Sequence, residues 1–153
     1  MIYKIRVILD AEDDVFRDLE VEAGSNLEEL HNAITQAFGF LGNEMASFYT
    51  ADENWNQDEE IPLFDIREGE DGSRLMRDTP LSEVMNEQAP KLLFVYDFLN
   101  MWTFLIELAD IAEPEKGMSY PNLMFAHGQL HEEAPDKEFV AEGGNDDFDE
   151  EYG

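Results

Sequence analysis

The residues of this chain that could perform chemistry are few. It has 37 acidic residues and three histidines but no cysteine, which excludes thiol catalysis, disulfides and cysteine-based zinc sites. His31 would be the candidate general base, yet no nucleophile or acid stands at a spacing that would partner it. The acidic stretch 146–152 lacks the glycine and the spacing of a calcium-binding loop. We therefore expect no catalytic residues and no cofactor.

One histidine pair has the spacing of a metal site. His127 and His131 are four residues apart, as in zinc-binding helices. Gly128 weakens a helix between them, and no third ligand is convincingly spaced, although Glu132 and Glu133 lie nearby in the sequence. We therefore expect no metal ion to be bound there.

A more specific group of candidates surrounds the sequence YDFLNMW at 96–102, which lies between two apolar runs. Asp97 is expected to accept hydrogen bonds from backbone N–H groups of a tight turn, and Asn100 to adopt the left-handed conformation there. A deep pocket shared by these residues and His31 would favour an enzyme, whereas a filled core would argue against one. The candidate binding residues are His31, Tyr96, Asp97, Asn100 and Trp102.

Apolar periodicity predicts the elements that position these residues. Residues 2–9 and 15–21 alternate and predict a hairpin in which Arg17 shares the inward side. Residues 25–38 carry a helical apolar stripe with His31 partly buried beside it, and Ser25 with Glu28 has the spacing of a capping box. Residues 45–50 predict a third strand.

The second half of the chain contains one strong hairpin. Residues 92–98 and 102–108 are apolar on both faces, which predicts two central strands. A short helix capped by Thr79 is expected at 79–85.

Two further segments predict little regular structure. Residues 51–80 are expected to form a mobile acidic excursion up to that helix. The segment 119–133 contains Pro121 and Gly128 and is expected to be irregular.

These elements predict a single α+β domain at 1–135, followed by an acidic flexible tail at 136–153. The expected fold is a mixed or antiparallel sheet packed on one main helix. It would begin with a β-grasp-like strand–strand–helix–strand unit and end with the late hairpin.

The charge of the chain limits the classes of molecule that it is expected to bind. The formal net charge is −28 and the isoelectric point is about 4.1. Such a surface repels phosphate backbones and anionic membranes, so neither direct nucleic-acid binding nor membrane binding is expected. It favours a basic protein partner. No signal peptide or membrane span is recognised, and we expect a cytoplasmic protein that is a monomer or a weak homodimer.

Three stretches of the sequence resemble one known family. VFRDLEVEAGSNLEELHNAITQAFGF at 15–40 is similar to the family's strand–helix unit, and TPLSEVM at 79–85 resembles its Leu-Ser-Asp segment. YDFLNMW resembles its Tyr-Asp-Phe-Gly-Asp-x-Trp hairpin. This is the plasmid Ri open-reading-frame-three-like family, also called the insertion-element passenger TnpR-like family. The resemblance covers residues 2–136 and implies an α+β, β-grasp-like domain with no settled molecular function.

Several positions depart from the family's usual pattern. Glu44 and Ala46 stand where many members have His, and Phe104 stands where a His often follows the Trp. The hairpin Gly-Asp is replaced by Leu99-Asn100, and the usual Cys near the end is missing. The resemblance implies that any metal or polar site built on those His and Cys residues is lost in this chain.

The sequence is compatible with three functions. The first is a non-catalytic protein-interaction domain, associated with mobile-element families and binding an unidentified, basic partner. The second is an acidic DNA mimic that occupies the basic groove of a nucleic-acid-binding protein. The third is an enzyme that uses carboxylates and His31. The absence of a recognisable catalytic arrangement favours the first.

Overall fold

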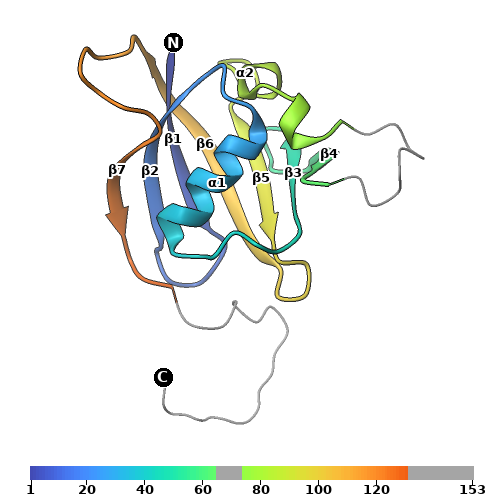
Figure 1. Cartoon of the computed structure of the whole chain (residues 1–153). Coiled ribbons are helices and arrows are strands. Elements are labelled where there is room, and N and C mark those ends of the chain that lie inside the picture. Colours follow the sequence, from blue (N-terminus) through green and yellow to red (C-terminus); the bar gives the residue numbers. More distant parts are fainter. Residues whose placement is uncertain (65–73, 131–153) are drawn as a thin grey trace.

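In the described part of the chain, the strands form one sheet and one long helix lies across it (Figure 1). The computed structural model describes residues 1–64 and 74–130. The strands are β1 (Ile2–Leu9), β2 (Phe16–Glu22), β3 (Ala46–Ala51), β4 (Gln57–Pro62), β5 (Lys91–Tyr96), β6 (Trp102–Ala112) and β7 (Asn122–His127). The helices are α1 (Leu27–Phe38) and the one-turn α2 (Leu81–Val84), with a 3-10 turn, η1 (Met76–Asp78), before α2.

The strand order in the sheet is β4-β3-β5-β6-β1-β2-β7, and each neighbouring pair is antiparallel. The elements are those of an α+β fold in which sheet predominates. Of the two predicted sheet types, the antiparallel one is observed throughout the described residues and the mixed one is wrong. The chain begins with β1, β2, α1 and β3, as the sequence pattern predicted. Strands β5 and β6 lie inside the sheet, which confirms their predicted central position.

The core lies between α1 and one face of the sheet. The rings of Phe38 on α1 and Phe104 on β6 are 4.8 Å apart. His31 lies about two helical turns before Phe38. Its ring meets the ring of Phe94 on β5 edge-on, with 5.7 Å between the ring centroids. Phe94 and Phe104 are fully buried, and burying a side chain of this size contributes about 1.5–3 kcal/mol.

Helix α1 begins one residue later than the sequence indicated. The capping box is formed by Asn26 and Glu29, not by Ser25 and Glu28. The Asn26 side chain accepts from the Glu29 N–H at 2.9 Å, and the Glu29 carboxylate accepts from the Asn26 N–H at 2.9 Å. Two overlapping pairs have the spacing of a capping box, and the pair that starts at Asn26 forms it.

Two strands were missed by the sequence reading. β4 occupies part of the predicted mobile excursion at 51–80, whose residues 65–73 lie outside the described residues. β7 occupies part of the segment predicted to be irregular. Pro121 precedes β7 and Gly128 follows it, so both residues mark the limits of the strand and do not interrupt it.

Several local predictions also need correction. Phe98 does not continue β5, because that strand ends at Tyr96. Thr79 does not cap α2: Pro80 occupies the N-cap position, and the Thr79 hydroxyl donates to the Leu75 carbonyl at 2.8 Å. The predicted tail at 136–153 lies outside the described residues.

Arg17 faces the core side of the first hairpin, as predicted, and is buried. Its guanidinium donates to the carbonyls of Ala37 at 3.1 Å, Phe16 at 2.8 Å and His127 at 3.1 Å. Burial lowers the pKa of Arg17, but an arginine remains charged in proteins. One buried cation therefore joins the end of α1 to β2 and β7.

Candidate functional site

The five candidate residues gather at one end of the β5–β6 hairpin, and they line neither of the two depressions described below. His31 and Tyr96 are only 1% and 3% exposed, and Trp102 is also buried. Asp97 is buried to a similar degree, whereas Asn100 is exposed. A shared pocket was the condition for an enzyme that uses His31, and these side chains instead fill the core or shape the turn.

Aromatic rings surround the buried members of this group. The His31 ring is 6.1 Å from that of Tyr96, and Phe40 lies 4.8 Å from Tyr96 and 5.0 Å from Trp102. His31 Nδ1 is 3.1 Å from the Asn32 side-chain oxygen, while its buried Nε2 has no hydrogen-bond partner among the described residues. Burial lowers the pKa of His31 below its usual 6.5, so the imidazole is neutral at pH 7. The histidine was expected to be partly buried and is fully buried.

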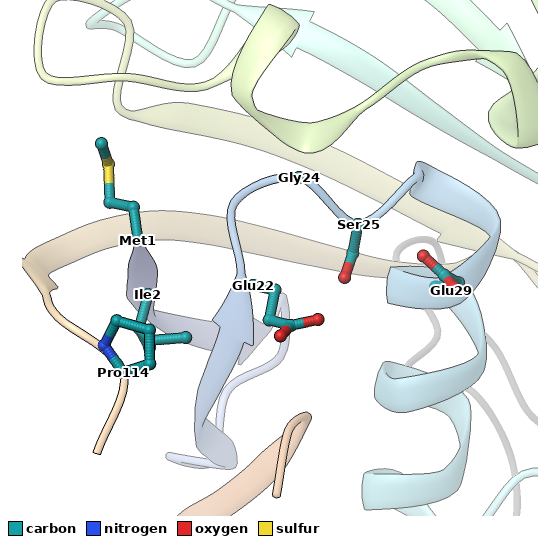
Figure 2. A pocket seen from close by; sticks show the side chains of 7 residues that line it. All are labelled: Met1, Ile2, Glu22, Gly24, Ser25, Glu29 and Pro114. Carbon is teal, nitrogen blue, oxygen red and sulfur yellow. The ribbon is translucent and has the colours of Figure 1, made fainter. Parts of the chain in front are cut away.

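Two open depressions elsewhere offer little chemistry. The first has a volume of about 350 Å³. The side chains that line it lie beside the starts of β1 and α1 (Figure 2). It is lined by Met1, Ile2, Glu22, Gly24, Ser25, Glu29 and Pro114. The Glu29 carboxylate is already used by the capping box, and none of the five candidate residues lines the depression.

The second depression, of about 410 Å³, lies at the β3–β4 connection and includes Asp52. The Asp52 carboxylate accepts from the backbone N–H groups of Asn54 and Asn56 and from the Asn56 side chain. These hydrogen bonds, led by those from Asn56, lower the pKa of Asp52. Its carboxylate therefore holds a surface turn together.

The turn between β5 and β6 is built by Asp97. Its φ is 65°, and that of Met101 is 57°, so both residues are left-handed and the prediction that Asn100 would be is wrong. The Asp97 carbonyl accepts from the N–H groups of Asn100 and Met101. Its carboxylate accepts from the Leu99 N–H at 3.2 Å and from the Asn100 side chain at 2.6 Å. The predicted role of Asp97 as the acceptor in the turn is thus confirmed.

The α1–β3 connection is held against this turn. The Tyr96 hydroxyl accepts from the Gly42 N–H at 2.9 Å, and the Asp97 N–H donates to the Met45 carbonyl at 2.8 Å. Gly42 has φ 79°, a conformation that other residues rarely adopt, and a side chain there would crowd Thr35. Two loops distant in sequence are therefore fixed side by side.

These two loops present apolar side chains to solvent. Leu99 and Leu41 are 94% and 89% exposed, and Met101 and Phe98 are 51% and 36% exposed. We call these four residues the turn surface. The sequence did not predict it, because Phe98 was expected to end a central strand at 92–98 and the residues before Trp102 were expected only to form a tight turn. A signal was available, since three apolar residues stood in a segment also predicted to be a tight turn.

The end of the molecule that carries the turn surface is acidic. The β1–β2 connection is held there, because the Asp10 N–H donates to the Thr103 carbonyl at 2.9 Å. The connections 10–15, 39–45 and 97–101 contain no Lys, Arg or His, but they contain several acidic residues: Asp10, Glu12, Asp13, Asp14, Glu44 and Asp97. Figure 1 shows all three connections at the same end of the sheet. The turn surface is thus apolar and set among carboxylates.

The sequence model of the plasmid pRiA4b ORF-3-like protein family matches residues 1–139. The chain belongs to this family. The match agrees with the resemblance seen at 2–136 and confirms it. No curated protein matches the sequence.

Solved structures show the same fold. A crystal structure of a protein of unknown function from Methanosarcina mazei Go1 superposes with a TM-score of 0.72 at 17% sequence identity, covering 82% of this chain and 68% of the other. At this identity the likeness shows the fold alone. The pRiA4b ORF-3-like family and this structural neighbour therefore establish what the chain is similar to, and they assign no activity.

Two of the positions that the resemblance marked as departures from the family pattern lie in the core. Ala46 on β3 and Phe104 on β6 are fully buried, whereas Glu44 is exposed. No group of three or more His, Asp or Glu side chains within residues 1–64 and 74–130 is placed to hold a metal ion. His131 and the acidic stretch 146–152 lie outside these residues. No helix in the described part of the chain is long and apolar enough to cross a membrane.

Proposed function

We propose that this member of the pRiA4b ORF-3-like family is a non-catalytic protein-interaction domain that binds its partner through the turn surface. The observation that carries the proposal is the exposure of Leu41, Phe98, Leu99 and Met101 on two joined loops. Exposed apolar side chains that gather in one place are typical of protein-binding sites.

The fixed shape of the turn supports a binding role. The carboxylate and the carbonyl of Asp97 accept the hydrogen bonds of the turn. The buried side chains of Tyr96 and Trp102 anchor the two strands that the turn connects. A loop held in one conformation loses little conformational entropy when a partner binds. The candidate residues found in the sequence therefore support the surface, and their exposed neighbours would make the contacts.

The charge around the turn surface specifies the partner's chemistry. The carboxylates of the connections 10–15, 39–45 and 97–101 favour Lys and Arg on a partner, while Leu41 and Leu99 require an apolar surface. The partner segment that fits is amphipathic, with apolar residues for the turn surface and basic residues around them. This agrees with the basic partner expected from the net charge of −28.

A pair of peptides tests this proposal. The first is a synthetic amphipathic peptide made only of Leu and Lys, and the second has every Leu replaced by Ser. Two-dimensional ¹H–¹⁵N NMR of the full-length chain would follow both titrations. We expect the Leu/Lys peptide to bind more tightly by about tenfold or more and to shift the amide signals of 39–45 and 97–101.

Equal affinity for both peptides would contradict the proposal, because charge alone would then explain the binding. That result would instead favour the acidic DNA mimic, which needs only a distribution of carboxylates and no apolar contact. Shifts confined to other parts of the chain would also contradict the assignment of the turn surface.

A further inference from the structure

The sulfur chemistry of this chain is confined to methionine. The sequence contains seven Met and no Cys, so thioethers are the only sulfur groups that an oxidant can modify. Met76 and Met85 are fully buried, whereas Met101, Met118 and Met124 are 51%, 39% and 48% exposed. A peroxide reaches a side chain that water reaches, so these three exposed thioethers are open to oxidation in the folded protein.

Of these three exposed residues, Met101 belongs to the turn surface. Met118 follows β6, which runs from Trp102 beside the turn to Ala112 at its far end. Met124 lies on β7, the last strand of the sheet. The turn surface contains no other sulfur, so Met101 is the position at which oxidation changes the surface itself.

The backbone of Met101 is held independently of its side chain. The Met101 N–H donates to the Asp97 carbonyl, and the Met101 carbonyl accepts from the Thr103 hydroxyl at 3.0 Å. Neither hydrogen bond uses an atom of the thioether. An oxygen added to the sulfur therefore changes the chemistry of the turn surface and leaves the turn itself in place.

Oxidation would make this apolar contact polar. The thioether sulfur attacks one oxygen of hydrogen peroxide, so that an S–O bond forms, the O–O bond breaks and the departing hydroxide is protonated to water. The sulfur loses two electrons and the peroxide gains them. The sulfoxide oxygen needs a hydrogen-bond donor, and an apolar partner segment would remove its water without supplying one.

We propose that Met101 is a modification site at which oxidation by a peroxide releases the partner of the turn surface. This inference rests on the proposed function, because it concerns the regulation of the same surface. The thioether is the form that binds, and the sulfoxide is the form that does not. Methionine sulfoxide reductases convert the sulfoxide back to the thioether, so the change is reversible.

Calorimetric titration with the Leu/Lys peptide tests the proposal, since this peptide contains no sulfur. The full-length chain is treated with hydrogen peroxide until mass spectrometry of its fragments shows that Met101 is converted, and the peroxide is then removed. We expect the oxidised chain to bind about tenfold or more weakly. Methionine sulfoxide reductases are expected to restore the affinity. Met76 and Met85 are expected to stay unoxidised, which shows that the chain remains folded.

Two variants assign the effect to one residue. Met101→Leu keeps an apolar side chain of similar size without sulfur, so its affinity for the peptide is expected to be the same before and after peroxide treatment. Met118→Leu removes an exposed thioether outside the turn surface and is the matched control. It is expected to lose affinity on oxidation as the wild type does.

Unchanged affinity of the oxidised wild type would overturn the proposal, and so would an equal loss of affinity in Met101→Leu. In both cases the reduced chain still binds the peptide, so the proposed function stands. Failure of the reduced wild type to bind the peptide would contradict the proposed function and, with it, this inference. The two failures can therefore be told apart.

Discussion

At the scale of single residues, His31 shows how burial changes the role of a side chain. The sequence identifies it as the only histidine in the main helix, and its environment makes it neutral and inaccessible. One nitrogen of this buried imidazole has no partner among the described residues. Protonating the ring in the folded protein is therefore unfavourable, and the free energy of unfolding depends on pH.

The pH dependence follows from the lowered pKa of His31. The unfolded chain, with the usual pKa of 6.5, binds a proton that the folded chain does not, so stability is full above this value and falls as the pH decreases. The loss is about 1.4 kcal/mol for each unit by which the pKa is lowered. His31→Leu removes this effect. Urea unfolding of both proteins at ~pH 7.5 and ~pH 5.5 measures the free energy of unfolding. We expect that of the variant to rise relative to that of the wild type at the lower pH. An unchanged difference would contradict the account.

Asp97 is the residue whose backbone and side chain together build the turn. Asp97→Ala removes the acceptor for the Leu99 N–H and the Asn100 side chain and leaves an alanine at φ 65°. We expect a loss of about 1–3 kcal/mol in the free energy of unfolding, measured with urea. Asp97→Asn is the matched control, since asparagine tolerates this φ and keeps one acceptor oxygen, and a smaller loss is expected. If neither substitution lowers the free energy of unfolding, the side-chain hydrogen bonds contribute little and the account is contradicted.

The sequence predicted the acceptor role of Asp97 but not its conformation. Asp and Asn both tolerate the left-handed region, so residue type alone could not decide between Asp97 and Asn100. The choice depends on where β5 ends, which the continuing apolar pattern through Phe98 concealed.

At the scale of elements, the strongly periodic segments were predictable and the edge strands were not. β1, β2, α1 and β6 bury one face in alternation or at helical spacing, whereas β5 is apolar and buried on both faces, and these patterns are visible in the sequence. β4 is an edge strand with Ile61 as its one fully buried residue, so its sequence resembles an acidic loop. β7 is exposed along most of its length and shows no alternation. These two strands form because they pair with β3 and β2 of the sheet, and their own sequence patterns do not indicate a strand.

The start of α1 offers a direct test at this scale. Asn26→Ala removes the cap and is expected to lower the free energy of unfolding by about 1 kcal/mol. Ser25→Ala is expected to change it by less than about half of that, because the Ser25 side chain is not the cap. Urea unfolding of both variants makes the comparison. A larger effect from Ser25→Ala would return the capping box to the position that the sequence first suggested.

At the scale of the whole molecule, the acidic charge and the exposed apolar residues have different roles. A net charge of −28 repels other acidic molecules at low salt and, under the proposed function, favours a basic partner. In that proposal the turn surface supplies the apolar contact that charge alone does not provide. The sequence predicted the family and the buried half of the candidate site. It could not predict the turn surface, because the exposure of Leu41 depends on how the α1–β3 connection is fixed to Tyr96.

The central claim is that the turn surface binds a protein segment, and one substitution tests it most directly. Isothermal titration calorimetry would measure binding of the Leu/Lys peptide to the wild type, Leu99→Asp and Met118→Asp. Leu99 is 94% exposed, so its substitution leaves the core intact, and Met118→Asp adds the same charge on an exposed residue elsewhere. We expect Leu99→Asp to weaken binding about tenfold or more and Met118→Asp to bind like the wild type. Equal affinities for all three proteins would contradict the claim.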